Sequence, residues 1–196
     1  MVITMTVHDV AAEMATVDAV LASGATTRRT DAFVLTWVKM EKQLRRLFSF
    51  LVFQHPNFSK SDEKALVKIF VDHKKLYAHT FVQCIDLLGS SAVKDLVGAD
   101  YAQYQTEIAR IKKYRNKIMH GQITGQNLQS PQLERDVKLL RDWIQAVAIG
   151  AQKAFGYDGV ARNTFIKAKS VPAIAKIKYP FSTVSEFKAW LDKNAT

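Results

Sequence analysis

Apolar residues recur at spacings of three and four along most of this chain, which is the period of a helix that buries one face. In segment 8–22 these positions are Val10, Met14, Val17 and Leu21. Segment 31–54 is apolar over a broader face, which is typical of a helix at the centre of a core. A third helix is predicted to begin after Ser59 or Ser61, either of which can cap it, and to run to about Leu88.

Two further helices are predicted before residue 158. Asp100, followed three residues later by Gln103, is typical of a helix start, and His120-Gly121 is typical of a helix end. Ser130-Pro131 predicts the start of a fifth helix that continues to near Gly156. No segment of the sequence shows the sustained alternation expected of a strand. The prediction is an all-α fold, in which residues 1–158 form an up-and-down bundle of about five helices.

The remaining residues, 159–196, are expected to form a short basic C-terminal extension. Between Asp158 and Glu186 there is no acidic residue. The basic residues of this stretch are Arg162, Lys167, Lys169, Lys176 and Lys178. A capping box from Thr183 to Glu186 predicts a terminal helix, whose apolar residues would dock the extension on the bundle.

The composition is that of an ordinary soluble globular protein, with 48% apolar and 23% charged residues among 196. Cys84 is the only cysteine, so the sequence provides neither a disulfide framework nor a cysteine-based zinc cluster. The first 22 residues lack the features of a signal peptide, and no apolar run is long enough to cross a membrane. These features predict a reduced, cytoplasmic location without a membrane partner.

The net charge of +10 is concentrated in two short segments. Residues 99–121 contribute +3 and residues 159–196 contribute +5. Such clustering is typical of proteins that bind a polyanion, above all nucleic acid. The alternative is that these residues form solvated basic faces with a role in solubility.

The predicted helix that ends at His120 contains the residues best suited to chemistry. On a helical wheel Arg115 lies within the apolar stripe, where an arginine requires a carboxylate, a subunit interface or a bound anion as its partner. Asn116 and His120 share a face, and Lys112 lies between them and Arg115. Three basic residues lie on the opposite, water-facing side: Arg110, Lys113 and Lys117.

The stretch Arg115-Asn116-Lys117-Ile118-Met119-His120 resembles the signature of HEPN domains. In that signature an arginine, often followed directly by asparagine, is separated by four to six residues from a histidine. The order of the predicted helices over residues 30–157 is also similar to that of HEPN domains, many of which are endoribonucleases.

The resemblance implies a metal-independent endoribonuclease without a cofactor, acting as a homodimer in which two motif helices form one cleft. Arg115, Asn116 and His120 would be the catalytic residues, because histidine transfers protons near neutral pH and arginine binds phosphate oxygens. The residues expected to bind RNA are Lys112, Lys113, Lys117, Arg162, Lys167 and Lys169. No cluster of metal ligands is apparent in the sequence, since His73 and His79 fall on different helix faces.

The resemblance also implies a toxin or antiviral-defence effector that is controlled by an antitoxin or another regulatory partner. Some HEPN toxins carry a tyrosine two positions after the histidine, which their antitoxin modifies. This chain has Gln122 at that position, so the sequence argues against that mode of control.

Three alternatives remain open at this point. Arg115 and His120 could instead be structural residues. Arg115 would then form an ion pair with a carboxylate of the second or third helix, and His120 would be a helix-end histidine favoured by the helix dipole. The chain could also be a non-catalytic, HEPN-like module that binds RNA or nucleotides. Finally, it could be a helical regulator whose basic tail contacts DNA, although no helix-turn-helix spacing supports that function.

Overall fold

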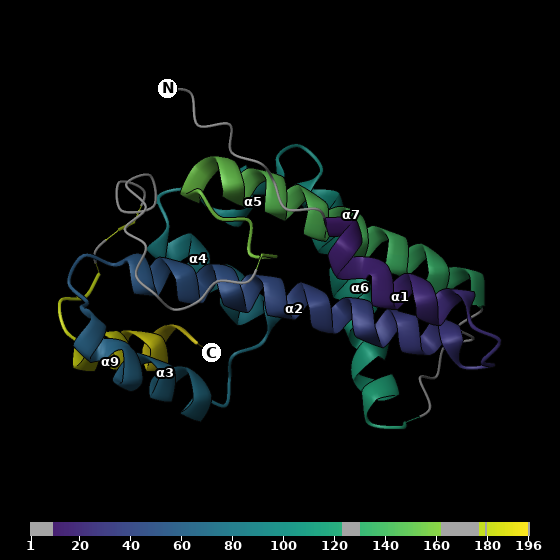
Figure 1. Cartoon of the computed structure of the whole chain (residues 1–196), viewed down its shortest axis with the longest axis horizontal. Helices are drawn as coiled ribbons and strands as arrows, with labels where there is room; N and C mark the ends of the chain where they lie inside the picture. The colour runs from purple at the N-terminus through teal and green to yellow at the C-terminus, as the bar shows by residue number, and fades with distance from the viewer. Residues whose placement is uncertain (1–9, 123–129, 162–176, 179, 196) are drawn as a thin grey trace. The chain divides into compact units, whose positions relative to one another are not determined.

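The computed structural model describes residues 10–122, 130–161, 177–178 and 180–195 (Figure 1). Helices form nearly all of the regular structure in these ranges, and the predicted all-α fold is confirmed. No helix in them is long and apolar enough to cross a membrane. The elements are α1 (Val10–Ala22), α2 (Arg28–Gln54), the 3-10 turn η1 (Lys60–Asp62), α3 (Glu63–Asp72), α4 (Ala78–Leu88), α5 (Val93–Val97), α6 (Tyr101–Met119), α7 (Ser130–Phe155) and α9 (Val184–Asn194).

The single helix predicted from Ser59 to about Leu88 is wrong, because the chain forms η1, α3 and α4 in this region. Of the two predicted caps, Ser59 and Ser61, the structure has Ser59 at the start of η1, where its backbone N–H donates to the Asp62 carboxylate at 2.7 Å. The break follows Asp72, where the Lys75 carbonyl accepts hydrogen bonds from the Tyr77 N–H at 3.2 Å and from the Thr80 hydroxyl at 2.9 Å. A side chain that bonds to a nearby carbonyl competes with the helical pattern, and no glycine or proline marks this break in the sequence.

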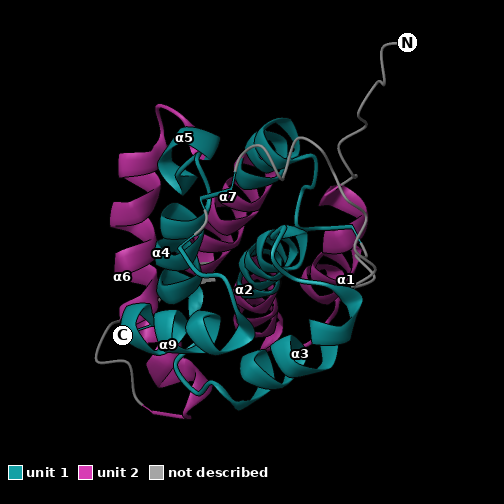
Figure 2. Cartoon of the chain, turned by 90° about the vertical axis from the view of Figure 1, so that its left-hand side faces the viewer, with its two compact units in different colours: residues 1–8, 41–96, 147–196 teal, residues 9–40, 97–146 magenta. Residues whose placement is uncertain are grey.

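The chain divides into two compact units, and the long helices α2 and α7 each contribute to both (Figure 2). Unit 1 contains Glu41–Leu96 and the described residues of Val147–Thr196. Unit 2 contains the described residues of Asp9–Met40, together with those of Val97–Ala146.

Unit 1 is built around aromatic residues that the C-terminal helix α9 completes. Phe187 is fully buried, and its ring lies 5.1 Å from that of Phe181 and 5.8 Å from that of Phe70. The ring of Phe48, from α2, packs edge-on against Phe70 at 5.5 Å. The expected docking of the terminal helix through its apolar residues is therefore present within this unit.

The segment after α7 is also held against α2 within unit 1. The Arg46 guanidinium donates to the Val160 carbonyl at 2.6 Å, and the Gln43 amide donates to the Asp158 carbonyl at 3.2 Å. Gly159 lies between these carbonyls at a φ of +75°, and a Cβ there would meet the Leu47 side chain at 2.7 Å. Glycine is therefore required at this turn.

Unit 2 contains α1, the N-terminal part of α2, α6 and most of α7. The largest side chains of its core are Trp37, Trp143, Tyr114 and Phe33, each at most 2% exposed. Ion pairs join α7 to the other helices of the unit, from Arg141 to Asp18 and from Arg29 to Glu134. The helix that carries the Arg-Asn-x-x-x-His stretch is therefore anchored in a well-packed unit.

Candidate active site at the end of α6

Helix α6 ends in a Schellman motif at the position predicted from the sequence. His120 is the last residue with near-helical geometry, and Gly121 follows with a φ of +64°. The Gln122 N–H donates to the Lys117 carbonyl at 2.8 Å, and the Gly121 N–H donates to the Ile118 carbonyl at 3.1 Å. These two bonds define the motif, and the left-handed residue it requires is a glycine. The backbone that carries the candidate site is therefore fixed at its end.

Arg115 is half-buried and stacks on an aromatic ring. Its guanidinium carbon lies 4.9 Å from the centre of the Trp37 ring, which belongs to α2 and is 2% exposed. The Arg115 Nη1 also donates to the Asn116 Oδ1 at 2.8 Å. A guanidinium over a tryptophan face is attracted by the ring electrons, so Trp37 and Asn116 together orient this charge.

His120 lies at the surface at the same end of α6. Its backbone N–H donates to the Asn116 carbonyl at 3.1 Å, while its side chain is exposed. Within the part of the chain that the structure describes, the imidazole forms no hydrogen bond or ion pair. Because α6 is helical as far as Met119, Arg115 and His120 are about 140° apart around the axis, whereas Asn116 and His120 are about 40° apart.

The structure describes only some of the residues assigned to RNA binding and of the other basic residues in the C-terminal extension. Lys112, Lys113 and Lys117 are exposed on α6. Arg162, Lys167, Lys169 and Lys176 lie outside the described residues. Lys178 is exposed, but it is attached to the end of α4, where its N–H donates to the Leu88 carbonyl at 2.7 Å.

Arg110 was predicted to lie on the water-facing side of α6, and this is wrong for its guanidinium, which binds two carboxylates. Its guanidinium binds the buried Asp136 carboxylate at 2.6 Å and the Glu107 carboxylate at 2.7 Å. Tyr114 also donates its hydroxyl to Asp136, and the Gln132 amide donates to the same carboxylate at 2.9 Å. A long side chain can carry its head group away from the direction of its Cα, so a wheel does not fix where a guanidinium lies.

The groups of this network have shifted pKa values. Burial, together with the hydrogen bond to Asp136, raises the pKa of Tyr114. For Arg110 burial acts to lower the pKa, but the hydrogen bonds to Asp136 and Glu107 outweigh it, so the pKa rises. Both groups stay protonated at neutral pH, and the network is a structural link between α6 and α7.

Trp37 and Asp136 are two further residues of this region that the sequence prediction does not name. No sequence signal places Trp37 under Arg115. Asp136 had a signal, because it lies three residues after Leu133 and four before Leu140 in the apolar stripe of α7. A carboxylate at such a position requires a buried partner.

No protein-family model matches this chain, no curated protein shows a significant match to its sequence, and no solved structure shows a significant match to its fold. The HEPN resemblance therefore depends on Arg115, Asn116 and His120 and on the helical architecture. Among the described residues no three His, Cys, Asp or Glu side chains are grouped as ligands for a metal ion.

Proposed function

We propose that this protein is a metal-independent endoribonuclease with its active site at the end of α6. One observation carries the proposal: Trp37 and Asn116 orient the Arg115 guanidinium, five residues before an exposed histidine. A guanidinium oriented in this way can bind a phosphate without losing much conformational freedom. His120 is accessible to take up and release protons near neutral pH.

The proposed reaction uses the 2′-hydroxyl of RNA as the nucleophile. One His120 takes the proton from this hydroxyl as its oxygen attacks the adjacent phosphorus. The bond from phosphorus to the 5′-oxygen breaks, and that oxygen receives a proton from a second histidine. Arg115 stabilises the negative charge on the non-bridging oxygens. The products are a 2′,3′-cyclic phosphate and a 5′-hydroxyl.

The second histidine comes from a second copy of the chain in this proposal. The backbone positions of Arg115 and His120 are about 140° apart around the axis of α6, so helix geometry alone does not bring both residues of one chain to one phosphate. A homodimer would place the Arg115 of one copy beside the His120 of the other. A toxin or antiviral-defence role, held in check by a regulatory partner, fits an enzyme of this kind.

The decisive experiment measures cleavage of labelled RNA in the presence of EDTA. His120→Ala and Arg115→Ala should each lower the rate by about 10²- to 10⁴-fold, as expected when a proton-transfer or charge-stabilising group is lost. Gln122→Ala, an exposed change at the same helix end, is the control and should retain full activity. Full activity of His120→Ala would exclude the proposed mechanism.

A mixture of the wild type with His120→Ala tests the dimer. Because the mechanism needs one His120 from each copy, a mixed dimer should be inactive, so activity should fall with the square of the wild-type fraction, and sedimentation should show a dimer. A fully active monomer would refute the composite site. Tight binding of RNA without any cleavage by the wild type would instead favour the non-catalytic RNA-binding module.

A further inference from the structure

The loop between α3 and α4, together with the first turn of α4, presents aromatic rings and lysines to solvent. Tyr77 is 52% exposed, and its ring lies parallel to that of the exposed His79, with 6.0 Å between the centroids. Lys74 and Lys75 are also exposed, and neither forms an ion pair with any described residue. We refer to Lys74, Lys75, Tyr77 and His79 as the loop platform.

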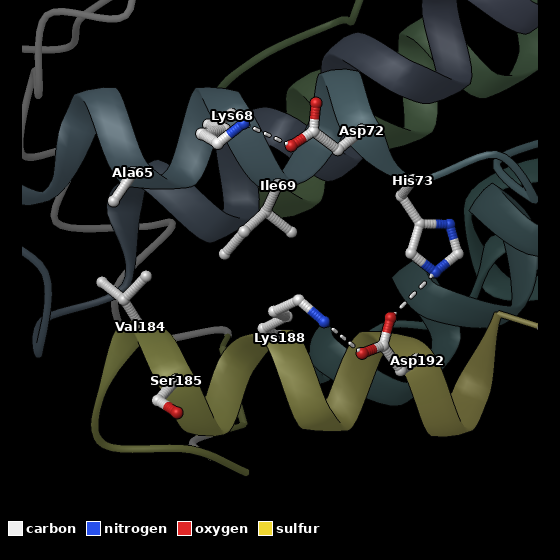
Figure 3. Close-up of a pocket in the computed structure, with 9 residues that line it drawn as sticks. All are labelled: Ala65, Lys68, Ile69, Asp72, His73, Val184, Ser185, Lys188 and Asp192. Carbon is white, nitrogen blue, oxygen red and sulfur yellow. Dashed lines mark hydrogen bonds and ion pairs between the residues drawn. The ribbon is translucent and has the colours of Figure 1, made fainter.

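Hydrogen bonds on both sides of the loop hold the platform in one conformation. The His73 Nδ1 accepts from the Lys75 N–H at 3.3 Å, and its Nε2 lies 3.5 Å from an Asp192 carboxylate oxygen on α9 (Figure 3). The Lys75 carbonyl accepts from the Tyr77 N–H and from the buried hydroxyl of Thr80. A surface that is already ordered loses little conformational entropy when it binds a partner.

The carboxylates beside the loop are already paired with other lysines. Asp72 accepts from Lys68 at 2.7 Å, and Asp192 accepts from Lys188 at 2.7 Å (Figure 3). Both pairs lie along the groove of about 520 Å³ between α3 and α9, at whose end His73 is located. Their charges therefore balance locally, and the charges of Lys74 and Lys75 are left to attract an anionic partner.

We propose that the loop platform binds single-stranded RNA, with one base stacked on Tyr77 and the neighbouring phosphates bound by Lys74 and Lys75. Exposed aromatic rings beside lysines are the means by which proteins bind single strands without reading their sequence. The choice of RNA rests on the proposed function, but the binding does not depend on the residues of α6. The platform would add affinity for substrate from unit 1 of the chain.

The test measures binding to the full-length His120→Ala protein, which leaves the RNA intact. The probes are an unstructured fluorescent RNA and an abasic strand of the same length and charge. Tyr77→Ala should weaken RNA binding by about fivefold or more, the lower end of what one base–aromatic stack contributes, and should leave binding of the abasic strand unchanged. Tyr77→Phe keeps the ring and should bind RNA as the parent does.

The lysines are tested through the dependence of RNA binding on salt. Lys74→Gln/Lys75→Gln should reduce the slope of log affinity against log salt by up to about 1.4, since each phosphate contact on a single strand contributes about 0.7. The matched control is Lys94→Gln/Lys153→Gln, which removes two other exposed lysines of the same unit and should change the slope much less.

Unchanged RNA affinity of Tyr77→Ala would overturn the proposal, and so would an equal loss of affinity for both strands. Binding of phosphatidylserine vesicles that depends on Tyr77, with RNA binding unaffected, would assign the platform to membranes and would also overturn it. If the wild type fails to cleave RNA but binding still depends on Tyr77, the nuclease mechanism fails and this inference stands.

Discussion

Replacing Tyr114 with phenylalanine removes one hydroxyl from the polar network of unit 2 and keeps the ring in place. Tyr114 and its acceptor Asp136 are each 1% exposed. After the change Asp136 retains its bonds to Arg110 and Gln132 at 2.6 Å and 2.9 Å, so its charge stays paired. Hydrogen bonds to charged groups contribute about 1.5–3 kcal/mol, and we expect Tyr114→Phe to lower the free energy of unfolding by this amount.

Tyr157 provides a matched control in unit 1. It is 8% exposed and its hydroxyl donates to a neutral acceptor, the carbonyl of Ala161, at 2.9 Å. The same substitution there removes a neutral hydrogen bond, for which about 0.5–1.5 kcal/mol is expected. Both variants lose the same atom from a buried ring. Their difference therefore reports the charged partners of the Tyr114 hydroxyl, which are the acceptor Asp136 and the Arg110 guanidinium that donates to this hydroxyl at 3.2 Å.

Urea denaturation followed by circular dichroism and by tryptophan fluorescence measures both variants. Each variant should lower the urea midpoint without a change in m-value, and the two probes should give coincident transitions if unfolding is two-state. If Tyr114→Phe destabilises the protein no more than Tyr157→Phe does, then Asp136 is not held by Tyr114 as the structure indicates.

Alkaline pH provides a second measurement on the same variant. Because the pKa of Tyr114 is raised in the folded protein, the folded state holds this proton more tightly than the unfolded state does. Its contribution to stability is complete below the unfolded pKa of about 10 and is lost as the pH rises toward the folded value. Unfolding free energies measured above about pH 10 should therefore fall less steeply in Tyr114→Phe than in the wild type.

Three further predictions follow from individual contacts. Trp37→Leu removes the ring under Arg115 and should lower kcat for RNA cleavage about tenfold or more. Trp37→Phe keeps an aromatic ring and should lower kcat less than Trp37→Leu does. Gly150→Ala should destabilise the protein in thermal melts, although alanine normally favours a helix, because its Cβ would lie 2.1 Å from the Leu96 carbonyl oxygen. Burial raises the pKa of Cys84 to about 12, so a thiol reagent at pH 8 should label it only after unfolding; labelling of the native protein would contradict its place in the core.

The helices were predictable where the chain itself contains the signal for an end. Gly121 ends α6, and Thr183 caps α9 by accepting from the Glu186 N–H at 3.2 Å. The break between α3 and α4 could not be predicted in the same way. It depends on the Thr80 hydroxyl and the backbone of Lys75, and threonine occurs often inside helices without breaking them.

The sequence could name candidate residues for the site but not the groups that they contact. The wheel placed Arg115 among apolar positions and predicted a carboxylate, a subunit interface or a bound anion as its partner. It did not predict the contact with the ring of Trp37, which depends on how α2 and α6 pack in unit 2. Helix periodicity determines which face of one helix is buried, and it contains no information on which residue of a second helix meets it.

The two arginines of α6 show why the kind of partner matters for function. The two carboxylates that bind Arg110, Glu107 and Asp136, neutralise its charge and use it for structure. Two contacts of Arg115, with the indole ring of Trp37 and with the Asn116 Oδ1, are contacts with uncharged groups that orient its guanidinium. A positive charge fixed in this way is suited to binding phosphate. Loss of Arg110 should therefore appear mainly in stability, and loss of Arg115 mainly in RNA cleavage.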